Sequence, residues 1–198
     1  MFNLITVYSC AAVIVIAAVS TVAAEESSAP KKPNIVLVVA DDMSWADAGC
    51  YGNKDVKTPT IDALAKEGLR FTNCFTATAM CAPTRQQLYT GLFPKRNGAV
   101  ANHTKVRPGT KSVVHHLEAL GYTVALQGKK HFGPKDSFPL ENTSLKELCE
   151  GEKPFCYIYC SHNPHLPWTS GKEISYDPAS FTVPPYLLDT PETRTALS

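Results

Sequence analysis

The sequence predicts an α/β fold with a largely parallel sheet flanked by helices. Two observations lead to this fold class. Continuous apolar runs typical of buried strands alternate with segments that have helical spacing. Charged or imidazole side chains then follow three of the apolar runs directly. Because ligand sites of open α/β sheets gather at the carboxyl ends of the strands, one functional site is expected there.

Three strands are predicted from apolar runs. Residues 34–40 form a run without polar alternation, which is typical of a central parallel strand covered on both faces. Residues 122–126 and 155–160 give the second and third strands. The polar residues that follow these runs are Asp41 and Asp42, then Lys129 and His131, then His162 and His165.

Three helices are predicted between the strands. Thr58-Pro59-Thr60 precedes apolar residues at helical spacing, and Gly68 lies near their end. Residues 83–90 form a short helix, with Pro83 just inside its start and Gly91 just past its end. Residues 112–120 repeat the pattern before Gly121.

Composition excludes some classes of function. The chain is 44% hydrophobic and 19% charged, which suits one well-buried core. Its formal net charge is +1, and the sequence contains neither a basic stripe nor a block of like charges. Nucleic acid and anionic membrane are therefore not expected as partners.

The N-terminus predicts export. Residues 1–24 are interpreted as a cleaved signal peptide, 25–33 as a polar linker, and 34–198 as the domain. No Lys or Arg precedes the apolar run, which is just long enough to span a bilayer, so a retained anchor is the alternative. Either route places the domain outside the cytosol, in a secreted, periplasmic or lysosomal location. After signal cleavage, no stable membrane association is expected.

The seven cysteines do not define a disulfide framework. Cys156 and Cys160 share one face of the third strand about 13 Å apart, too far for a bridge, and are expected to be buried thiols. Cys50, Cys74 and Cys149 could pair, but the sequence does not select partners.

Two groups of residues could carry chemistry. Asp41 and Asp42 end a buried strand, where a hard divalent cation would offset their charge; a turn or helix cap is the alternative. Cys81 precedes a helix whose free N–H groups favour an anion, and Arg85 can reach back over that first turn. A purely structural role is the alternative for Cys81.

Residues 81–91, CAPTRQQLYTG, resemble the signature of the sulfatase family, Cys-x-Pro-x-Arg followed by Thr-Gly. Residues 32–42, 58–65, 121–123, 128–131 and 161–165 also resemble that family, in the same order. The resemblance implies an alkaline-phosphatase-like fold. The pattern continues beyond position 198 in the family, so the fold is expected to be incomplete at the C-terminus.

The resemblance also implies a mechanism. Cys81 would be oxidised to formylglycine by a formylglycine-generating enzyme, and Asp41, Asp42 and the modified Cys81 would bind Ca²⁺. The hydrated aldehyde would attack the sulfur of a sulfate ester or sulfamate, with a sulfated glycan as the expected substrate. Arg85 would hold the formylglycine and Lys129 the sulfate. His131 would orient the diol, and His165 would lie near the leaving group.

Some family features are absent from the sequence. The family completes its metal site with a later Asp-Asn pair and binds sulfate with a further lysine, and neither occurs here. We therefore expect this chain alone to turn over substrate poorly or not at all. Residues 130–134 and the proline-rich motifs after position 176 are most similar to the heparan N-sulfatase branch, which implies an N-sulfated glucosamine.

Three other functions fit the same residues. The first is a phosphate or phosphonate ester hydrolase of the same superfamily. The second is a secreted glycan-binding remnant without chemistry. The third is a disulfide-stabilised extracellular module in which Cys81 is bridged. Asn102 and Asn142 lie in N-glycosylation sequons and are expected on surface loops.

Overall fold

The computed structural model describes residues 31–167 and 176–198. Contacts divide the chain into residues 1–32 and 33–198, and the second unit contains the fold described below. The predicted signal peptide and most of the linker lie outside the described residues. Within the described ranges, no helix is long and apolar enough to span a bilayer.

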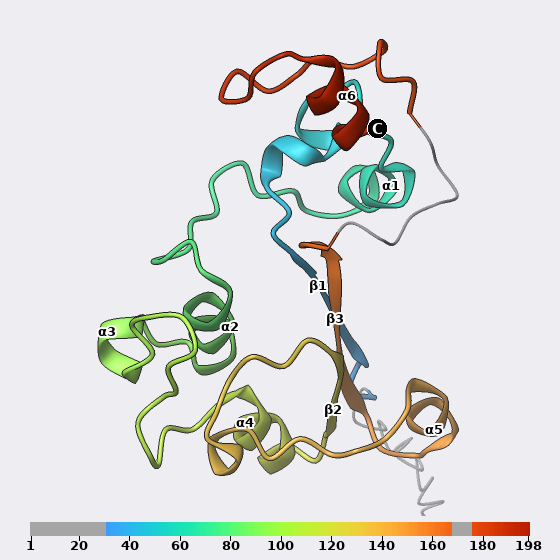
Figure 1. The fold of residues 1–198 in the computed structure, drawn as a ribbon. Coiled ribbons are helices and arrows are strands. Elements are labelled where there is room, and N and C mark those ends of the chain that lie inside the picture. Colours follow the sequence, from blue (N-terminus) through green and yellow to red (C-terminus); the bar gives the residue numbers. More distant parts are fainter. Residues whose placement is uncertain (1–30, 168–175) are drawn as a thin grey trace, which may run out of the picture. The chain divides into compact units, whose positions relative to one another are not determined.

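The sheet contains three parallel strands, which confirms the α/β class (Figure 1). Its order is β1 (Ile35–Asp41), β3 (Phe155–Pro164) and β2 (Thr123–Gly128). Ile35 and Thr123 pair with Cys156 and Phe155 of β3, respectively, so the carboxyl ends of all three strands lie at one edge. That edge is where the sequence predicts the functional site.

Helices connect these strands and follow the last one. They are α1 (Pro59–Glu67), α2 (Cys81–Thr90), α3 (Pro94–Asn97), α4 (Val113–Ala119), α5 (Leu145–Glu150) and α6 (Pro191–Leu197). Short 3-10 turns occupy η1 (Trp45–Asp47), η2 (Gly49–Tyr51) and η3 (Lys135–Ser137).

Local sequence explains where these helices begin and end. Pro59 occupies the first turn of α1, where its missing N–H costs no helical hydrogen bond. Ser144 and Glu147 form a reciprocal capping box at the start of α5. Helix α2 ends at Gly91, whose φ of 67° is the left-handed conformation that glycine adopts without strain.

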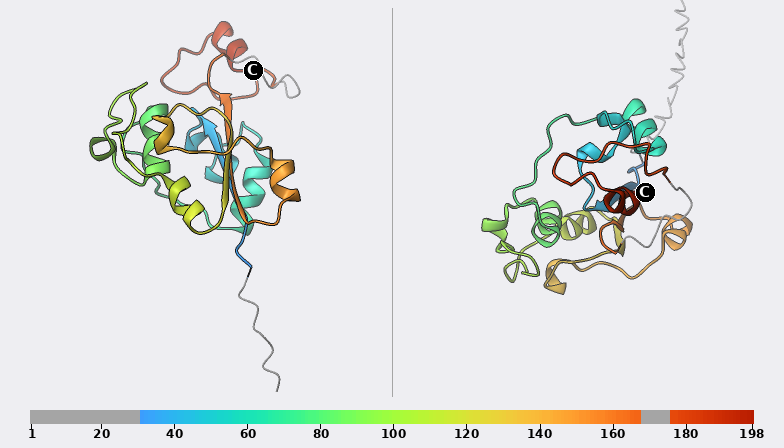
Figure 2. Two further views of the ribbon diagram at one scale, coloured as in Figure 1. Left: turned by 90° about the horizontal axis from the view of Figure 1, so that it is seen from below. Right: turned by 45° about the horizontal axis from the view of Figure 1, so that its top comes forward.

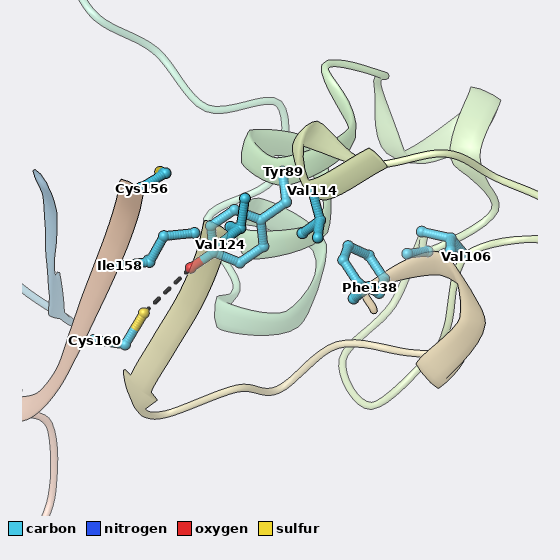
Figure 3. Close-up of a cluster of buried hydrophobic side chains, with 9 residues drawn as sticks. Tyr89, Val106, Val114, Val124, Phe138, Cys156, Ile158 and Cys160 are labelled. Atoms are coloured by element: carbon cyan, nitrogen blue, oxygen red, sulfur yellow. Dashed lines mark hydrogen bonds between the residues drawn. The ribbon is translucent and has the colours of Figure 1, made fainter. Parts of the chain in front are cut away.

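The core lies between the sheet and helices α2 and α4. Figure 3 shows Tyr89 of α2 and Val114 of α4 packed beside Val124, Ile158 and Cys160 of the sheet. Alternate residues of β2 and β3 face the opposite side and pack against Leu148 of α5. The sheet is therefore covered by α2 and α4 on one face and by α5 on the other (Figure 2).

The cysteines of β3 behave as predicted. Cys156 and Cys160 are buried free thiols, and the Cys160 thiol lies 3.2 Å from the Tyr89 hydroxyl. Burial raises the pKa of the Cys156 thiol. The other cysteines of the described residues, Cys81 among them, are also free.

The structure corrects the prediction for the first strand. Among the described residues β1 is an edge strand rather than a central one, because only β3 pairs with it. Val36 and Val38 point away from the core and are 60% and 67% exposed. Helix α1 likewise contributes no buried residue, and Leu69, Phe71 and Phe75 after it remain exposed.

Two predicted boundaries also shift. Helix α2 begins at Cys81, so this residue is the first of the helix rather than the residue before it. Strand β3 continues to Pro164, beyond the predicted end at residue 160. The extension brings His162 into the strand and places His165 immediately after it.

Candidate active site

The centre of the candidate site is Asp41, the last residue of β1. Its side chain is almost completely buried and pairs with two cations. The Arg85 Nη2 atom lies 3.0 Å from Asp41 Oδ1, and Lys129 Nζ pairs with Asp41 Oδ2. Arg85 also donates from Nη1 to the Lys129 carbonyl oxygen at 3.3 Å. The ends of β1 and β2 and the first turns of α2 therefore meet at one carboxylate.

Electrostatics keep Asp41 ionised. Burial raises the pKa of Asp41, but the hydrogen bonds from Lys129 and Arg85 outweigh this effect and hold the pKa below its ordinary value. The cluster has one anion and two cations, so its net charge is positive. A positive cluster at the strand ends suits an anionic ligand such as sulfate.

Asp42 faces a different way from Asp41. Its φ of 61° lies in the left-handed region, which aspartate tolerates better than most residues. Asp42 Oδ2 is 3.6 Å from His165 Nε2, and both side chains are exposed. The structure thus joins the first and third strand ends through Asp42 and His165, as the sequence predicts for this edge.

Cys81 lies at the N-terminus of α2, beside Asn102, a residue that the sequence indicates only as part of a glycosylation sequon. The Cys81 thiol is 3.5 Å from Asn102 Oδ1, which also accepts the Ala82 N–H at 3.4 Å. The N-cap residue, Met80, makes no side-chain hydrogen bond to the helix. Asn102 therefore supplies from a distant loop the acceptor that an N-cap side chain usually provides.

His131 is paired with another histidine, His103. His131 Nε2 and His103 Nδ1 are 3.0 Å apart, and the two rings are tilted at 46°. His131 Nδ1 is buried and has no hydrogen-bond partner among the described residues. Burial and the charges of His103, Lys129 and Arg85 lower the pKa of His131.

The predicted residues therefore fall into three contact groups. The first contains Asp41, Arg85 and Lys129, and the second contains Asp42 and His165. The third comprises the pairs Cys81–Asn102 and His131–His103. Helix α2 links Cys81 to Arg85, and the loop after β2 links Lys129 to His131, so the first and third groups are adjacent.

Asn102 and His103 were missed as site residues. Their only sequence signal is the glycosylation sequon, which predicts a surface loop, and both are indeed exposed. Nothing in their spacing from Cys81 or His131 predicts the contacts, because these arise from the tertiary path of the loop.

The described residues fit calcium in donor type but not in number. Asp41 and Asp42 offer carboxylate oxygens, which calcium prefers, but the ion takes six to eight such ligands. Both oxygens of Asp41 already pair with cations. Residues 31–167 and 176–198 contain no group of three or more His, Cys, Asp or Glu side chains that could hold a metal.

The comparisons with known proteins identify the family of the chain. The family model described as Sulfatase matches residues 33–150, and the chain belongs to the sulfatase family. An ulvan-active sulfatase of Formosa agariphila is 45% identical over 154 residues, which cover 68% of this chain and 31% of that protein. The chain thus spans about a third of the length of this relative.

Two solved structures share the fold. A protein in complex with its substrate D-glucosamine-2-N,6-O-disulfate matches with a TM-score of 0.56 and 24% identity, covering 70% of this chain and 36% of its own. A phosphonate monoester hydrolase of Agrobacterium radiobacter matches with a TM-score of 0.51 and 30% identity. The match covers 65% of this chain and 26% of the hydrolase chain. The first likeness supports the alkaline-phosphatase-like fold.

Proposed function

We propose that the chain carries the nucleophile and sulfate-binding part of a hydrolase that releases sulfate from a sulfated glycan. The observation that carries this proposal is the buried cluster of Asp41, Arg85 and Lys129. Its member Arg85 lies in α2, four residues after Cys81. Family membership supports sulfuric ester hydrolysis, and the positive cluster supplies the electrostatics that such an anionic substrate needs.

Cys81 is the proposed nucleophile precursor. Oxidation of Cys81 to formylglycine by a formylglycine-generating enzyme would supply a hydrated aldehyde. One of its hydroxyls would attack sulfur and expel the sugar oxygen or nitrogen, and the second hydroxyl would then collapse to the aldehyde and release sulfate. The half-buried position of Cys81 at the start of α2 gives this group both a helix N-terminus and access from solvent. An exported location is also part of the proposal.

The surrounding residues have separate proposed roles. Arg85 fixes the carboxylate of Asp41 and would offset negative charge near the modified Cys81. Lys129 lies at the rim of the cluster, less buried than Arg85, and would bind a sulfate oxygen. His131, whose buried Nδ1 has no hydrogen-bond partner among the described residues, would hold one diol hydroxyl of the modified Cys81 in position.

His165 is the proposed general acid. It is partly exposed, and its Nε2 lies 3.6 Å from Asp42 Oδ2. An imidazolium at the leaving-group side could protonate the departing oxygen or nitrogen. Asp42 would also give an oxygen ligand to a calcium ion, and Asp41 would do so where the ion displaces one of its two cationic partners.

The proposed substrate class is a sulfated sugar, and N-sulfoglucosamine is the specific candidate. The sequence motifs after residue 130 favour a sulfamate, whereas the first relative is named for ulvan. A matched pair of 2-N-sulfated and 6-O-sulfated glucosamine derivatives separates S–N from S–O cleavage.

Sulfate release tests the proposal. The 198-residue chain, produced together with a formylglycine-generating enzyme, is incubated with the two sulfated sugars, and free sulfate is measured by ion chromatography. We expect slow release that disappears in Cys81→Ala and persists in the surface control His116→Ala. Release that is unchanged in Cys81→Ala would contradict the proposal.

A phosphonate or phosphate ester hydrolase is the second candidate. The 30% identity to the phosphonate monoester hydrolase over 65% of this chain supports this candidate. The same preparation is therefore assayed with aryl sulfate and aryl phosphonate esters of one phenol. Faster Cys81-dependent release of phenol from the phosphonate would support this second function and contradict the first.

A further inference from the structure

The contact between His103 and His131 suggests a function for a residue outside the family motifs. Their ring nitrogens, His103 Nδ1 and His131 Nε2, are 3.0 Å apart. At this distance one nitrogen must donate and the other accept, because two protonated or two bare nitrogens would repel. The pair therefore fixes where the proton of His131 lies.

Either His131 Nε2 or His103 Nδ1 could be the donor, and the surroundings of His131 decide which one it is. Its Nδ1 is buried and has no partner among the described residues, and the ring lies in the positive field of Lys129 and Arg85, which Asp41 only partly offsets. A bare lone pair interacts favourably with that positive field, whereas an N–H dipole pointing the same way does not. Neutral His131 is therefore expected to carry its proton on Nε2 and donate it to His103 Nδ1.

The loop that carries His103 is held in place on both sides. The buried side chain of Gln86, in α2, donates to the Thr104 carbonyl oxygen at 2.8 Å and accepts from the Val106 N–H at 3.0 Å. The Thr104 hydroxyl closes the turn by donating to the Ala101 carbonyl oxygen at 2.6 Å. An exposed histidine is thereby supported by a buried residue of the signature helix.

The backbone at both histidines is also unusual. His103 and His131 have φ values of 61° and 52°, in the left-handed region that residues other than glycine rarely occupy. Such conformations persist only where the surrounding structure enforces them, and they concentrate at functional sites. Both residues of this hydrogen-bonded pair therefore have a backbone conformation that the surrounding structure must maintain.

We propose that His103 is a positioning residue that holds His131 in the Nε2–H tautomer and leaves His131 Nδ1 bare. On the proposed function, this bare Nδ1 would accept a hydrogen bond from a hydroxyl of the modified Cys81. The proposed purpose of this tautomer rests on the proposed function, but the tautomer itself does not. A hydrogen bond to one ring nitrogen is the usual way in which a protein selects the proton position on the other.

Two substitutions at position 103 distinguish the effect of losing the side-chain acceptor from the effect of changing the backbone conformation. His103→Asn keeps an acceptor, Oδ1, at the position of Nδ1, and asparagine tolerates the left-handed conformation. His103→Gly also tolerates that conformation but removes the acceptor. His116→Ala, on the exposed side of α4, is the control that leaves the pair intact.

The test is heteronuclear NMR of isotope-labelled histidine in the 198-residue chain with Cys81 as the free thiol. His131→Gln assigns the His131 signals. We expect wild type, His103→Asn and His116→Ala to show protonated Nε2 and bare Nδ1. In His103→Gly we expect the His131 nitrogen shifts to move together toward averaged values, as both tautomers become populated.

Two results would overturn the proposal. One is a wild-type His131 that is protonated on Nδ1, and the other is an unchanged tautomer in His103→Gly. If His103→Gly fails to give a folded amide spectrum, loss of the tautomer in His103→Asn would overturn it equally. Neither measurement needs an aldehyde or a substrate, so failure of the proposed sulfatase activity would leave these outcomes readable.

Discussion

Arg85 Nη2 and Asp41 Oδ1 lie 3.0 Å apart, and each side chain is only 3% exposed. This ion pair connects the signature helix α2 to the end of the first strand. Because both charges are removed from water, the pair is expected to matter most when one partner is lost and the other is left buried alone.

Arg85→Met should destabilise the fold by about 3–5 kcal/mol, because it removes the more deeply buried of the two cations that compensate Asp41. Chemical denaturation with urea measures this loss. Lys146→Met, in the exposed pair with Glu150, is the matched control and should change stability little. Equal small effects for both variants would refute the structural role of the Arg85–Asp41 pair.

The lowered pKa of His131 predicts a pH dependence of stability. Between its folded pKa and the unfolded value near 6.5, the unfolded chain binds more protons at this position than the folded chain. The contribution of His131 to the free energy of unfolding is therefore present above pH about 6.5 and is lost as pH falls through the folded pKa. His131→Gln should flatten this part of the stability profile in urea titrations. A His131→Gln profile that is parallel to wild type would contradict the prediction.

Asn102 should stabilise the start of α2 from outside the helix. Asn102→Ala removes the acceptor for the Ala82 N–H and is expected to cost about 1 kcal/mol, as for an N-cap substitution. Asn102→Asp keeps an acceptor and adds a negative charge at the helix N-terminus, so it should restore stability. Thermal unfolding of the two variants tests this, and equal losses would show that the contact is not a cap.

The exposed face of β1 should promote self-association. Val36 and Val38 are more than half exposed on an edge strand, and such edges pair with other chains. The double substitution Val36→Lys and Val38→Lys should shift the chain toward monomer with little loss of stability. Light scattering across a concentration series measures the change; unchanged association would place the contact elsewhere.

Much of the fold could be predicted because local signals agree with it. The apolar runs at β1, β2 and β3 and the Pro and Gly boundaries of α1 and α2 are properties of neighbouring residues. The exposed face of β1 could not be predicted, because an apolar run indicates what a strand could bury and not which segments cover it.

The candidate site was predictable to a similar extent. Strand-end positions identify Asp41, Lys129 and His165, and the family signature identifies Cys81 and Arg85. The opposite directions of Asp41 and Asp42 depend on a left-handed backbone at Asp42 that the sequence does not specify. Asn102 and His103 reach the site on a loop that Gln86 anchors through Thr104 and Val106, contacts between residues far apart in sequence.

The central claim is that Cys81 is the precursor of the catalytic aldehyde, and mass spectrometry of the peptide that contains Cys81 tests it most directly. The chain is exported from a host that has formylglycine-generating activity, and the peptide is mapped with and without an aldehyde-specific hydrazide. We predict a fraction of peptide with the mass of formylglycine that reacts with the hydrazide and disappears in Cys81→Ala. A Cys81 recovered wholly as a thiol, or bridged to another cysteine, would contradict the account.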